Sequence, residues 1–189
     1  KMKKITVVIP ALNEEKAIKR VLKSIPSLKL KKMGYNTEVM VVDNGSTDKT
    51  KLFAQSNGAK VIVQPVRGYG NAYKAGFANA TGDIIATGDA DLTYPFEDLP
   101  AFIELLESRK LDFINTDRLK TLNPAVMHWT HQFGNLVLTT ICQMLYPGFP
   151  FKDSQSGMWI FKRKAWDKLN VNSSGMPFSQ EIKIEMYKK

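Results

Sequence analysis

Short strand-like segments alternate with helix-like segments through residues 5–116 of this chain. The strand-like segments are rich in Val, Ile and other apolar residues and cover 5–9, 38–43, 61–63, 82–86 and 112–116. Most of the segments between them, such as 96–108, repeat apolar residues at helical spacing. This alternation predicts an α/β fold with a mostly parallel central sheet and helices on both faces. Asn13 is predicted to cap the first helix.

The pattern changes after Asp117. Residues 118–131 are polar and irregular, 133–146 are strongly apolar, and 147–151 form an aromatic, turn-rich segment. The apolar segment is interpreted as a helix that packs in the core or lies at a bilayer interface. Residues 156–161 predict a strand, and 163–169 and 178–187 predict helices.

We expect a single domain over residues 1–189, with 1–116 and 117–189 as its two halves. The chain begins at Lys1 rather than Met, and its last helical pattern runs almost to Lys189. We therefore expect it to be truncated at its carboxyl end and to be a piece of a longer protein.

Two aspartates, Asp89 and Asp91, follow the strand-like segment 82–86. In an extended chain, residues i and i+2 point to the same face, so both carboxylates should aim at one point beyond the strand. Converging carboxylates repel each other unless a cation lies between them, and Mg²⁺ and Mn²⁺ favour oxygen ligands. The pair therefore predicts a divalent metal site. The alternative is an ordinary surface turn rich in Asp and Gly.

The glycine-rich loops that bind phosphate in common nucleotide folds are missing. The first strand is followed by Pro10–Glu15, which contains no glycine, and Gly68-x-Gly70 lacks the third glycine of a dinucleotide fingerprint. No P-loop motif occurs either. Acidic side chains stand at strand ends instead, and Asp43 can accept hydrogen bonds from a base or a ribose. A metal held by the aspartate pair can then bind a diphosphate.

Composition narrows the range of partners. The net charge of +9 favours an anionic partner such as a nucleotide or a membrane surface. The lysines are dispersed and no nucleic-acid-binding motif is present, so nucleic acid is not expected. A single cysteine, Cys142, excludes an intramolecular disulfide. No signal peptide or membrane-spanning run is visible, so we expect a cytoplasmic protein at the cytoplasmic face of the membrane.

Five segments together form a recognisable series that covers most of residues 5–162: Val7–Glu15, Val41–Asp48, Gly68–Gly76, Gly82–Pro95 and Asp153–Gly157. In this order they resemble family 2 glycosyltransferases of the GT-A fold, in the dolichyl- or polyprenyl-phosphate branch. The resemblance implies transfer of a sugar from a UDP- or GDP-linked donor, with inversion at the anomeric carbon. It also implies Mg²⁺ or Mn²⁺ as cofactor.

The resemblance further implies a donor site built from these residues: Pro10, Asn13, Glu14, Asp43, Gly68, Gly70, Lys74 and Asp89. Asp89 and Asp91 would hold the metal. Two departures from the family pattern are visible. Asn44 stands where the family often has a second Asp, and Met158-Trp159 stands where Phe-Arg is usual, which puts an expected basic contact in question.

The acceptor decides the rest of the chemistry. A metal neutralises charge on the departing diphosphate. A sugar hydroxyl needs a base, for which Asp153 and Glu181 are candidates. A lipid phosphate is already ionised and needs cations, which this group can supply: Arg118, His128, His131 and Lys152.

We expect a dolichyl or polyprenyl phosphate as acceptor. Alternatives are transfer to a sugar hydroxyl and a non-catalytic or truncated nucleotide-sugar-binding module. A sugar-1-phosphate nucleotidyltransferase would need a glycine-rich, Arg/Lys-bearing signature after the first strand, which is lacking.

Overall fold

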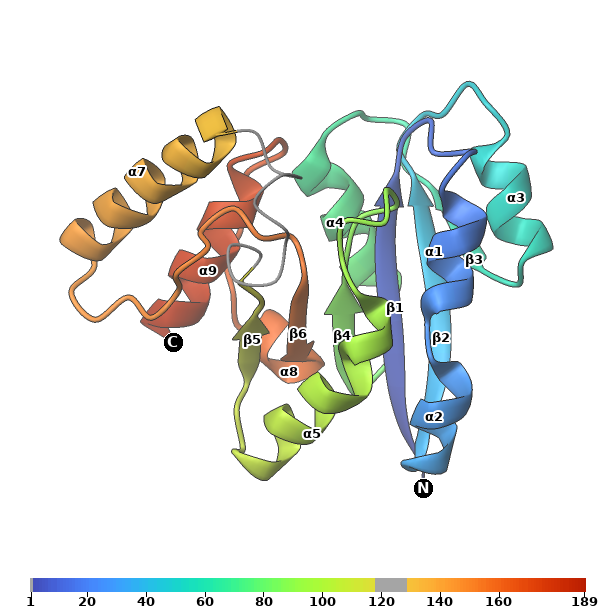
Figure 1. Cartoon of the computed structure of the whole chain (residues 1–189), viewed down its shortest axis with the longest axis horizontal. Helices are drawn as coiled ribbons and strands as arrows, with labels where there is room; N and C mark the ends of the chain where they lie inside the picture. Colours follow the sequence, from blue (N-terminus) through green and yellow to red (C-terminus); the bar gives the residue numbers. More distant parts are fainter. Residues whose placement is uncertain (1, 118–128) are drawn as a thin grey trace.

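A six-stranded sheet forms the centre of the protein in the computed structural model (Figure 1). The structure describes residues 2–117 and 129–189, except for the side chains of 129–133. The strands are β1 (Lys3–Ala11), β2 (Tyr35–Asp43), β3 (Lys60–Val63), β4 (Ile84–Thr87), β5 (Phe113–Asn115) and β6 (Trp159–Lys162). The described helices are α1 (Ile18–Ser24), α2 (Ser27–Lys32), α3 (Thr50–Ser56), α4 (Tyr69–Asn79), α5 (Leu99–Ser108), α7 (Trp129–Leu145), α8 (Arg163–Trp166) and α9 (Phe178–Lys188), and a 3₁₀ turn (Phe96–Asp98) precedes α5.

The sheet order is β3-β2-β1-β4-β6-β5. Strands β1, β2, β3 and β4 pair in parallel, as predicted, whereas β6 runs antiparallel to both β4 and β5. Strand β6 comes from the 117–189 half of the chain and lies between two strands of the 1–116 half. The two predicted halves therefore share one sheet.

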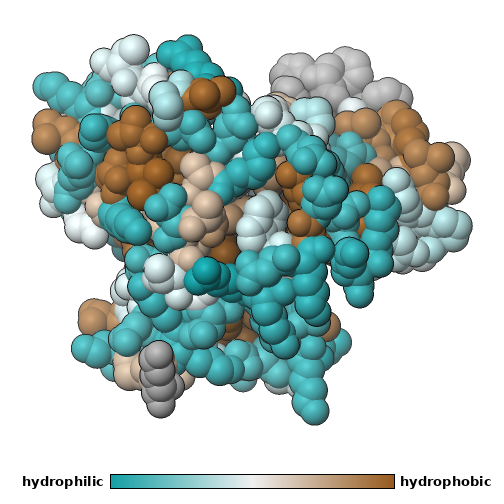
Figure 2. All heavy atoms as spheres, turned by 180° about the vertical axis from the view of Figure 1, so that it is seen from behind, coloured by the Kyte–Doolittle hydropathy of each residue, from teal (hydrophilic) through white to brown (hydrophobic). Residues whose placement is uncertain are grey.

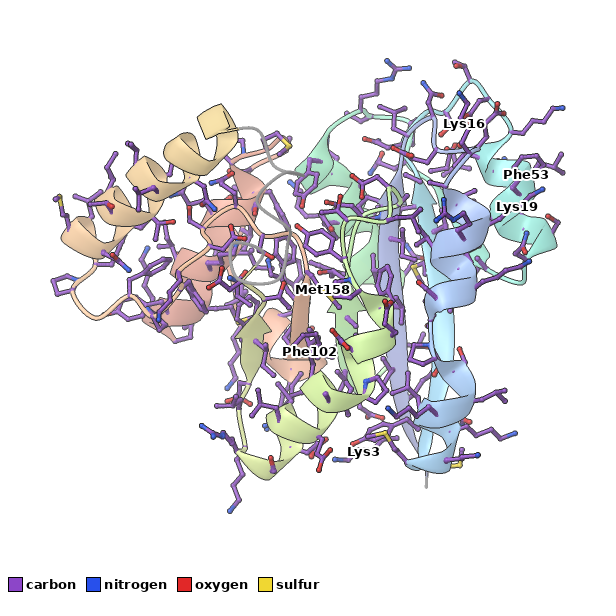
Figure 3. The ribbon with its side chains drawn as sticks, in the orientation of Figure 1. Lys3, Lys16, Lys19, Phe53, Phe102 and Met158 are labelled. Carbon is purple, nitrogen blue, oxygen red and sulfur yellow. The ribbon has the colours of Figure 1, made fainter. Side chains whose placement is uncertain are left out.

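Helices cover both faces of the sheet, which confirms the predicted layering (Figure 1). Helices α1, α2, α3 and α5 pack on one face, and α4 and α9 pack on the other. Side chains at the start of β6 alternate between the two faces. Met158, directly before the strand, lies in the same cluster as Phe102 and α5 (Figure 3), whereas Trp159 packs with α4 and α9. The Lys19 Nζ lies 3.6 Å from the centre of the Phe53 ring and links α1 to α3 (Figure 3).

The predicted helix cap at Asn13 is wrong. Helix α1 begins at Ile18, and its N-cap residue is Ala17, whose methyl side chain has no hydrogen-bond acceptor. Asn13 has a φ of 58°, and its Oδ1 accepts a hydrogen bond of 2.8 Å from the backbone N–H of Thr47. A contact with the loop after β2 therefore replaces the local cap.

Helix α7 is amphipathic, but its mostly polar side faces the protein and its apolar side faces outward. Its inward side is formed by Asn135, Thr139 and Cys142, which are buried. Its apolar side faces outward, and Leu136 and Met144 are 59% and 75% exposed. Apolar side chains gather at this edge of the molecule in Figure 2. The interpretation of α7 as a buried core helix is therefore wrong for its outward apolar side. Among the residues that the structure describes, no helix meets the length and hydropathy of a membrane span.

Candidate functional site

A cavity of about 340 Å³ opens where the carboxyl ends of β1, β2 and β4 meet. Parallel α/β sheets commonly bind ligands at this edge. The lining includes five of the residues predicted for the donor and metal sites: Pro10, Glu14, Gly68, Asp89 and Asp91. The remaining lining residues are Ala11, Leu12, Asn44, Arg67, Tyr69, Ala72 and Ala90.

The two aspartates predicted to hold a metal lie on this one cavity. Asp91 Oδ1 accepts a hydrogen bond of 2.9 Å from the backbone N–H of Thr93, which turns the chain back after Asp91. Burial, and then the nearby carboxylates of Asp91 and Asp48, raise the pKa of Glu14. Three carboxylates and one guanidinium, that of Arg67, line the cavity, so its charged side chains carry an excess of negative charge.

This set of carboxylates fits a cation that is shared with a substrate. Among the residues that the structure describes, no group of three His, Cys, Asp or Glu side chains is arranged to hold a metal. Mg²⁺ is commonly bound by one or two carboxylates together with substrate phosphates. The pair Asp89 and Asp91 is compatible with that pattern, because two carboxylates on one cavity would leave the other ligand positions to a diphosphate.

Asn44 fixes one wall of the cavity. Its Nδ2 donates hydrogen bonds to the carbonyl oxygens of Gln64 and Val66, at 3.0 and 3.1 Å. Its Oδ1 accepts a hydrogen bond of 2.8 Å from the backbone N–H of Gly68. A carboxylate could not make the two donations. The departure at position 44 therefore has a structural role, which is to hold segment 64–68 beside the site.

Four of the predicted donor residues, Asn13, Asp43, Gly70 and Lys74, are not part of the described lining. Asp43 is 5% exposed, and its Oδ1 accepts a hydrogen bond of 3.3 Å from the backbone N–H of Ser46. Ser46 Oγ in turn accepts from the backbone N–H of Asn13 at 3.0 Å. In this structure Asn13 and Asp43 tie the loops after β1 and β2 together.

Gly68, Gly70 and Lys74 contact the segment 172–174 that precedes α9. A Cβ added at either glycine would lie 2.3 Å from a backbone carbonyl oxygen of this segment. Gly68 also has a φ of 145°, which side chains rarely permit. Lys74 Nζ donates a hydrogen bond of 3.0 Å to the carbonyl oxygen of Asn172. These residues were predicted near the base and ribose, and the structure gives them a packing role as well.

Glu181 lies on α9 and holds the same segment. Its carboxylate accepts hydrogen bonds from the backbone N–H groups of Asn172, at 3.0 Å, and Ser173, at 2.8 Å. Burial alone would raise the pKa of Glu181, but these hydrogen bonds outweigh it and hold the pKa below its usual value.

Asp153 and Lys152 occupy contrasting environments. Asp153 is fully buried, and its Oδ1 accepts hydrogen bonds from Asn135 Nδ2 at 2.7 Å and from the backbone N–H of Gln155 at 3.1 Å. Lys152 is exposed. The other predicted acceptor-side residues, Arg118, His128 and the side chain of His131, lie outside the described residues.

Sequence reasoning missed the support beneath Asp89. The Tyr73 hydroxyl lies 3.3 Å from Asp89 Oδ1 and 3.3 Å from the carbonyl oxygen of Gly157. The Tyr94 hydroxyl accepts a hydrogen bond of 2.6 Å from the backbone N–H of Gly157. Burial raises the pKa of Tyr73 well above its usual value, so its hydroxyl remains a donor. The spacing of Tyr69 and Tyr73 by one helical turn, directly after Gly68, was the available signal.

Sequence reasoning also missed Lys183, which is fully buried on α9. Its Nζ donates to the carbonyl oxygens of Ser154, Ser156 and Ser179, at 2.7, 2.8 and 2.9 Å. Trp159, at the second unusual position, donates from Nε1 to the same Ser156 carbonyl oxygen at 2.8 Å. These bonds fix the loop that leads from Asp153 to Gly157.

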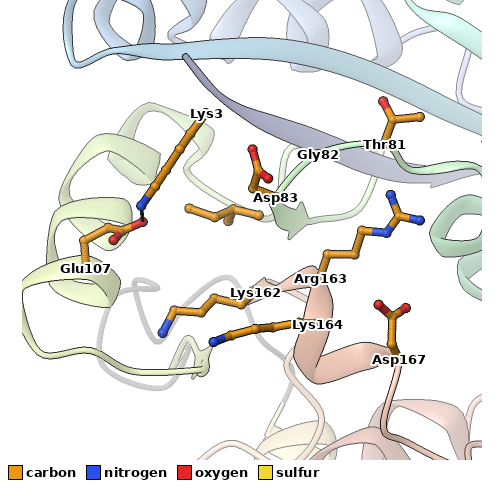
Figure 4. A pocket seen from close by; sticks show the side chains of 10 residues that line it. Lys3, Thr81, Gly82, Asp83, Glu107, Lys162, Arg163, Lys164 and Asp167 are labelled. Atoms are coloured by element: carbon orange, nitrogen blue, oxygen red, sulfur yellow. Dashed lines mark hydrogen bonds and ion pairs between the residues drawn. The ribbon is translucent and has the colours of Figure 1, made fainter. Parts of the chain in front are cut away.

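A second cavity, of about 460 Å³, includes Lys3 at the start of β1, the turn before β4 and the start of α8 (Figure 4). Side chains of both signs line it, and Lys3 Nζ forms an ion pair of 2.7 Å with Glu107. It lies at the other end of β1 and β4 from the aspartate pair and lacks the excess of carboxylates that marks the first cavity.

Comparison with known proteins places this arrangement in a family. The family model described as Glycosyl transferase family 2 matches residues 6–169. The low-salt glycan biosynthesis hexosyltransferase Agl6 of Haloferax volcanii is 39% identical over 183 residues, which cover 96% of this chain and 44% of Agl6. The dolichyl-phosphate hexose transferase of the same organism is 33% identical over 160 residues, covering 85% of this chain and 67% of that protein.

A solved structure agrees with this placement. Glucosyl-3-phosphoglycerate synthase from Mycobacterium tuberculosis, in complex with Mn²⁺, uridine diphosphate and glucosyl-3-phosphoglycerate, superposes with a TM-score of 0.76 at 26% identity. The match covers 98% of this chain and 66% of the synthase, so the chain spans only part of its relatives. The chain belongs to glycosyltransferase family 2, and its fold is the GT-A fold of these relatives.

Proposed function

We propose that this chain transfers a hexose from a UDP-linked donor to a polyprenyl phosphate such as dolichyl phosphate, with inversion and with Mg²⁺ or Mn²⁺ bound at Asp89 and Asp91. The observation that carries the proposal is that both aspartates line the cavity at the carboxyl ends of β1, β2 and β4. The uridine diphosphate and Mn²⁺ in the related synthase support the choice of donor and metal.

The residues of this chain have distinct tasks in that reaction. When bound, the cation neutralises the negative charge that develops on the leaving diphosphate. Asp89 and Asp91 hold it, and Asn44 holds the segment 64–68 that forms the donor wall. The hydrogen bonds of Asn13 and Asp43 hold the loops after β1 and β2 together, and these loops would form the nucleoside end of the site. A donor held in this way would present its sugar to the acceptor in a fixed orientation.

The environments of the candidate bases favour a phosphate acceptor over a hydroxyl acceptor. Asp153 is fully buried and bonded to Asn135, and Glu181 is bonded to two backbone N–H groups. Both carboxylates therefore already have structural partners. An ionised phosphate needs no base, and the cations proposed to hold it are Lys152, Arg118, His128 and His131.

The outward apolar side of α7 supports a lipid acceptor. Its exposed residues are Leu136, Val137, Leu138, Ile141, Met144 and Leu145. A helix with such a side can lie in the headgroup region of a bilayer. We propose that α7 brings the site to the cytoplasmic face of a membrane, where a polyprenyl phosphate is available. The relative named as a dolichyl-phosphate hexose transferase agrees with this acceptor.

The test is a transfer assay with UDP-glucose and other UDP-hexoses, dolichyl phosphate in liposomes, and Mn²⁺ or EDTA. We expect a lipid-linked sugar that forms with Mn²⁺ and not with EDTA, and a loss of at least about 100-fold in Asp89→Asn and Asp91→Asn. GDP-hexoses serve as the competing donors. Nucleotide binding without any transfer would instead support a non-catalytic module.

The related synthase motivates a second candidate acceptor, because its structure contains glucosyl-3-phosphoglycerate. Phosphoglyceric acid added in place of the lipid distinguishes the two acceptors. Transfer to phosphoglyceric acid alone would overturn the lipid proposal while leaving the donor site intact.

A further inference from the structure

The aromatic ring of Tyr73 is held rigidly beneath the site. Tyr73 is fully buried on α4. Its ring is stacked on Phe178 with a centroid distance of 5.8 Å and an interplanar angle of 4°. Trp159 and Phe77 pack against it at 5.0 and 5.6 Å. Because these neighbours come from α4, β6 and α9, the position of the hydroxyl is set by the core and not by the substrate.

The hydroxyl has one proton and three polar neighbours. Asp89 Oδ1 and the carbonyl oxygen of Gly157 each lie at 3.3 Å, and the Tyr69 hydroxyl is a further hydrogen-bond partner. The Gly157 carbonyl oxygen already accepts a shorter hydrogen bond, of 2.7 Å, from Thr87 Oγ1. An ionised carboxylate is a stronger acceptor than a hydroxyl, so we assign the phenolic proton to Asp89. A carboxylate has about four lone-pair sites, so the contact with Tyr73 uses one of them and does not itself block a ligand in the cavity that Asp89 lines.

We propose that Tyr73 is the positioning residue for Asp89, and that its buried hydroxyl orients this carboxylate toward a divalent cation. The inference rests on the proposed function, because it takes Asp89 to be a metal ligand. Residues that hydrogen-bond to metal ligands fix the orientation of those ligands, and their loss typically reduces metal affinity by about 10- to 100-fold.

The test compares three proteins: wild type, Tyr73→Phe and Tyr35→Phe. The Tyr35 hydroxyl lies 3.4 Å from the carboxylate of Glu107, at the far end of the sheet, so Tyr35→Phe removes the same kind of contact away from the site. Mn²⁺ binding is measured by the electron paramagnetic resonance signal of free Mn²⁺, with and without saturating UDP. UDP binding without metal is measured in parallel, and melting curves check that each variant is folded.

We expect Tyr73→Phe to raise the Mn²⁺ dissociation constant by about 10-fold or more, and Tyr35→Phe to leave it unchanged. UDP binding without metal should stay the same in all three proteins. If Tyr73→Phe is folded and binds Mn²⁺ as wild type does, the positioning role is overturned while the metal site stands. If wild type fails to bind Mn²⁺ even with UDP, the proposed metal-dependent function fails, and the role of Tyr73 fails with it.

Discussion

The ammonium nitrogen of Lys183 lies 2.8 Å from the carbonyl oxygen of Ser156, and both groups are buried. This contact joins α9 to the loop that ends at Gly157. Gly157 in turn contacts Tyr73 and Tyr94 beneath the aspartate pair. The last described helix is thus connected to the end of β4 that is followed by Asp89 through a chain of hydrogen bonds.

Lys183→Met should destabilise the protein strongly. The substitution keeps an apolar stem but leaves buried carbonyl oxygens without their donor, which should lower the free energy of unfolding by about 3 kcal/mol. Urea unfolding measures the change. Lys188→Met removes an exposed lysine from the same helix and should leave the stability almost unchanged. Equal effects of the two substitutions would contradict the role given to Lys183.

Gly70→Ala should disrupt the packing between α4 and segment 172–174. The new Cβ would lie 2.3 Å from a backbone oxygen that cannot rotate away, at a cost of about 2 kcal/mol or more. Gly134→Ala is the matched control, because a Cβ at this position in α7 meets no atom within 4 Å. That control should be neutral or should stabilise the protein by up to about 1 kcal/mol, because Ala favours helix. Thermal unfolding of both variants measures these changes in stability.

Asn44→Asp should weaken the donor wall. The substituted carboxylate would face the carbonyl oxygens of Gln64 and Val66 instead of donating to them. We expect a loss of about 2 kcal/mol in unfolding free energy and weaker UDP binding by calorimetry. The same substitution at exposed Asn57, which donates to the carbonyl oxygen of Phe53, should have a smaller effect. Unchanged UDP affinity in Asn44→Asp would show that segment 64–68 does not depend on this amide.

Glu181 should contribute to stability in a pH-dependent way. Its pKa in the folded protein lies below the ordinary value of 4.5, so the charged form is favoured by folding. Its contribution is therefore present above pH 4.5 and is lost as the pH falls through the lowered pKa. Glu181→Gln should lose about 1 kcal/mol at pH 7 relative to wild type, and this difference should shrink below pH 4.5.

Urea unfolding of both proteins between pH 3 and 7 measures the effect. Glu185→Gln, on the same helix, is the comparison, because Glu185 pairs with exposed Lys188 rather than with backbone N–H groups. A difference that grows on acidification would refute the assignment for Glu181.

Charged substitutions on α7 should separate membrane binding from donor binding. Ile141 and Met144 are 45% and 75% exposed, so the double change to Glu should be tolerated by the fold. It should reduce binding to anionic liposomes in a sedimentation assay by at least about tenfold, because apolar contact with the bilayer is lost. UDP binding should be unaffected. Leu28→Glu, at an 80% exposed position on α2, should leave both unchanged.

The locally encoded features of the fold could be predicted from sequence. The segment 5–9 lies within β1, and the helix expected at 96–108 is present as a 3₁₀ turn followed by α5. The presence of Asp89 and Asp91 at one cavity was also expected, but the reason differs, because β4 ends at Thr87 and residues 90–91 form a turn rather than an extended segment. The strand and helix predictions need only neighbouring residues.

Features that depend on distant segments could not be predicted. The position of β6 between β4 and β5 is set by pairing across the sheet, which no local pattern encodes. The helix cap expected at Asn13 is absent because Asn13 Oδ1 instead accepts from the backbone N–H of Thr47, a residue far along the chain. Gly70 was assigned to the donor site, whereas its closest neighbours are Phe178 and the backbone of Ser173.

The late arrival of β6 has a consequence during synthesis. In the described sheet, β5 pairs with β6, which leaves the ribosome well after β5 does. Until Trp159–Lys162 emerge, the outer side of β4 is an open edge, and such edges attract strands from other chains. Fragments that stop before Trp159 should therefore aggregate, whereas the emergence of β6 covers the edge of β4.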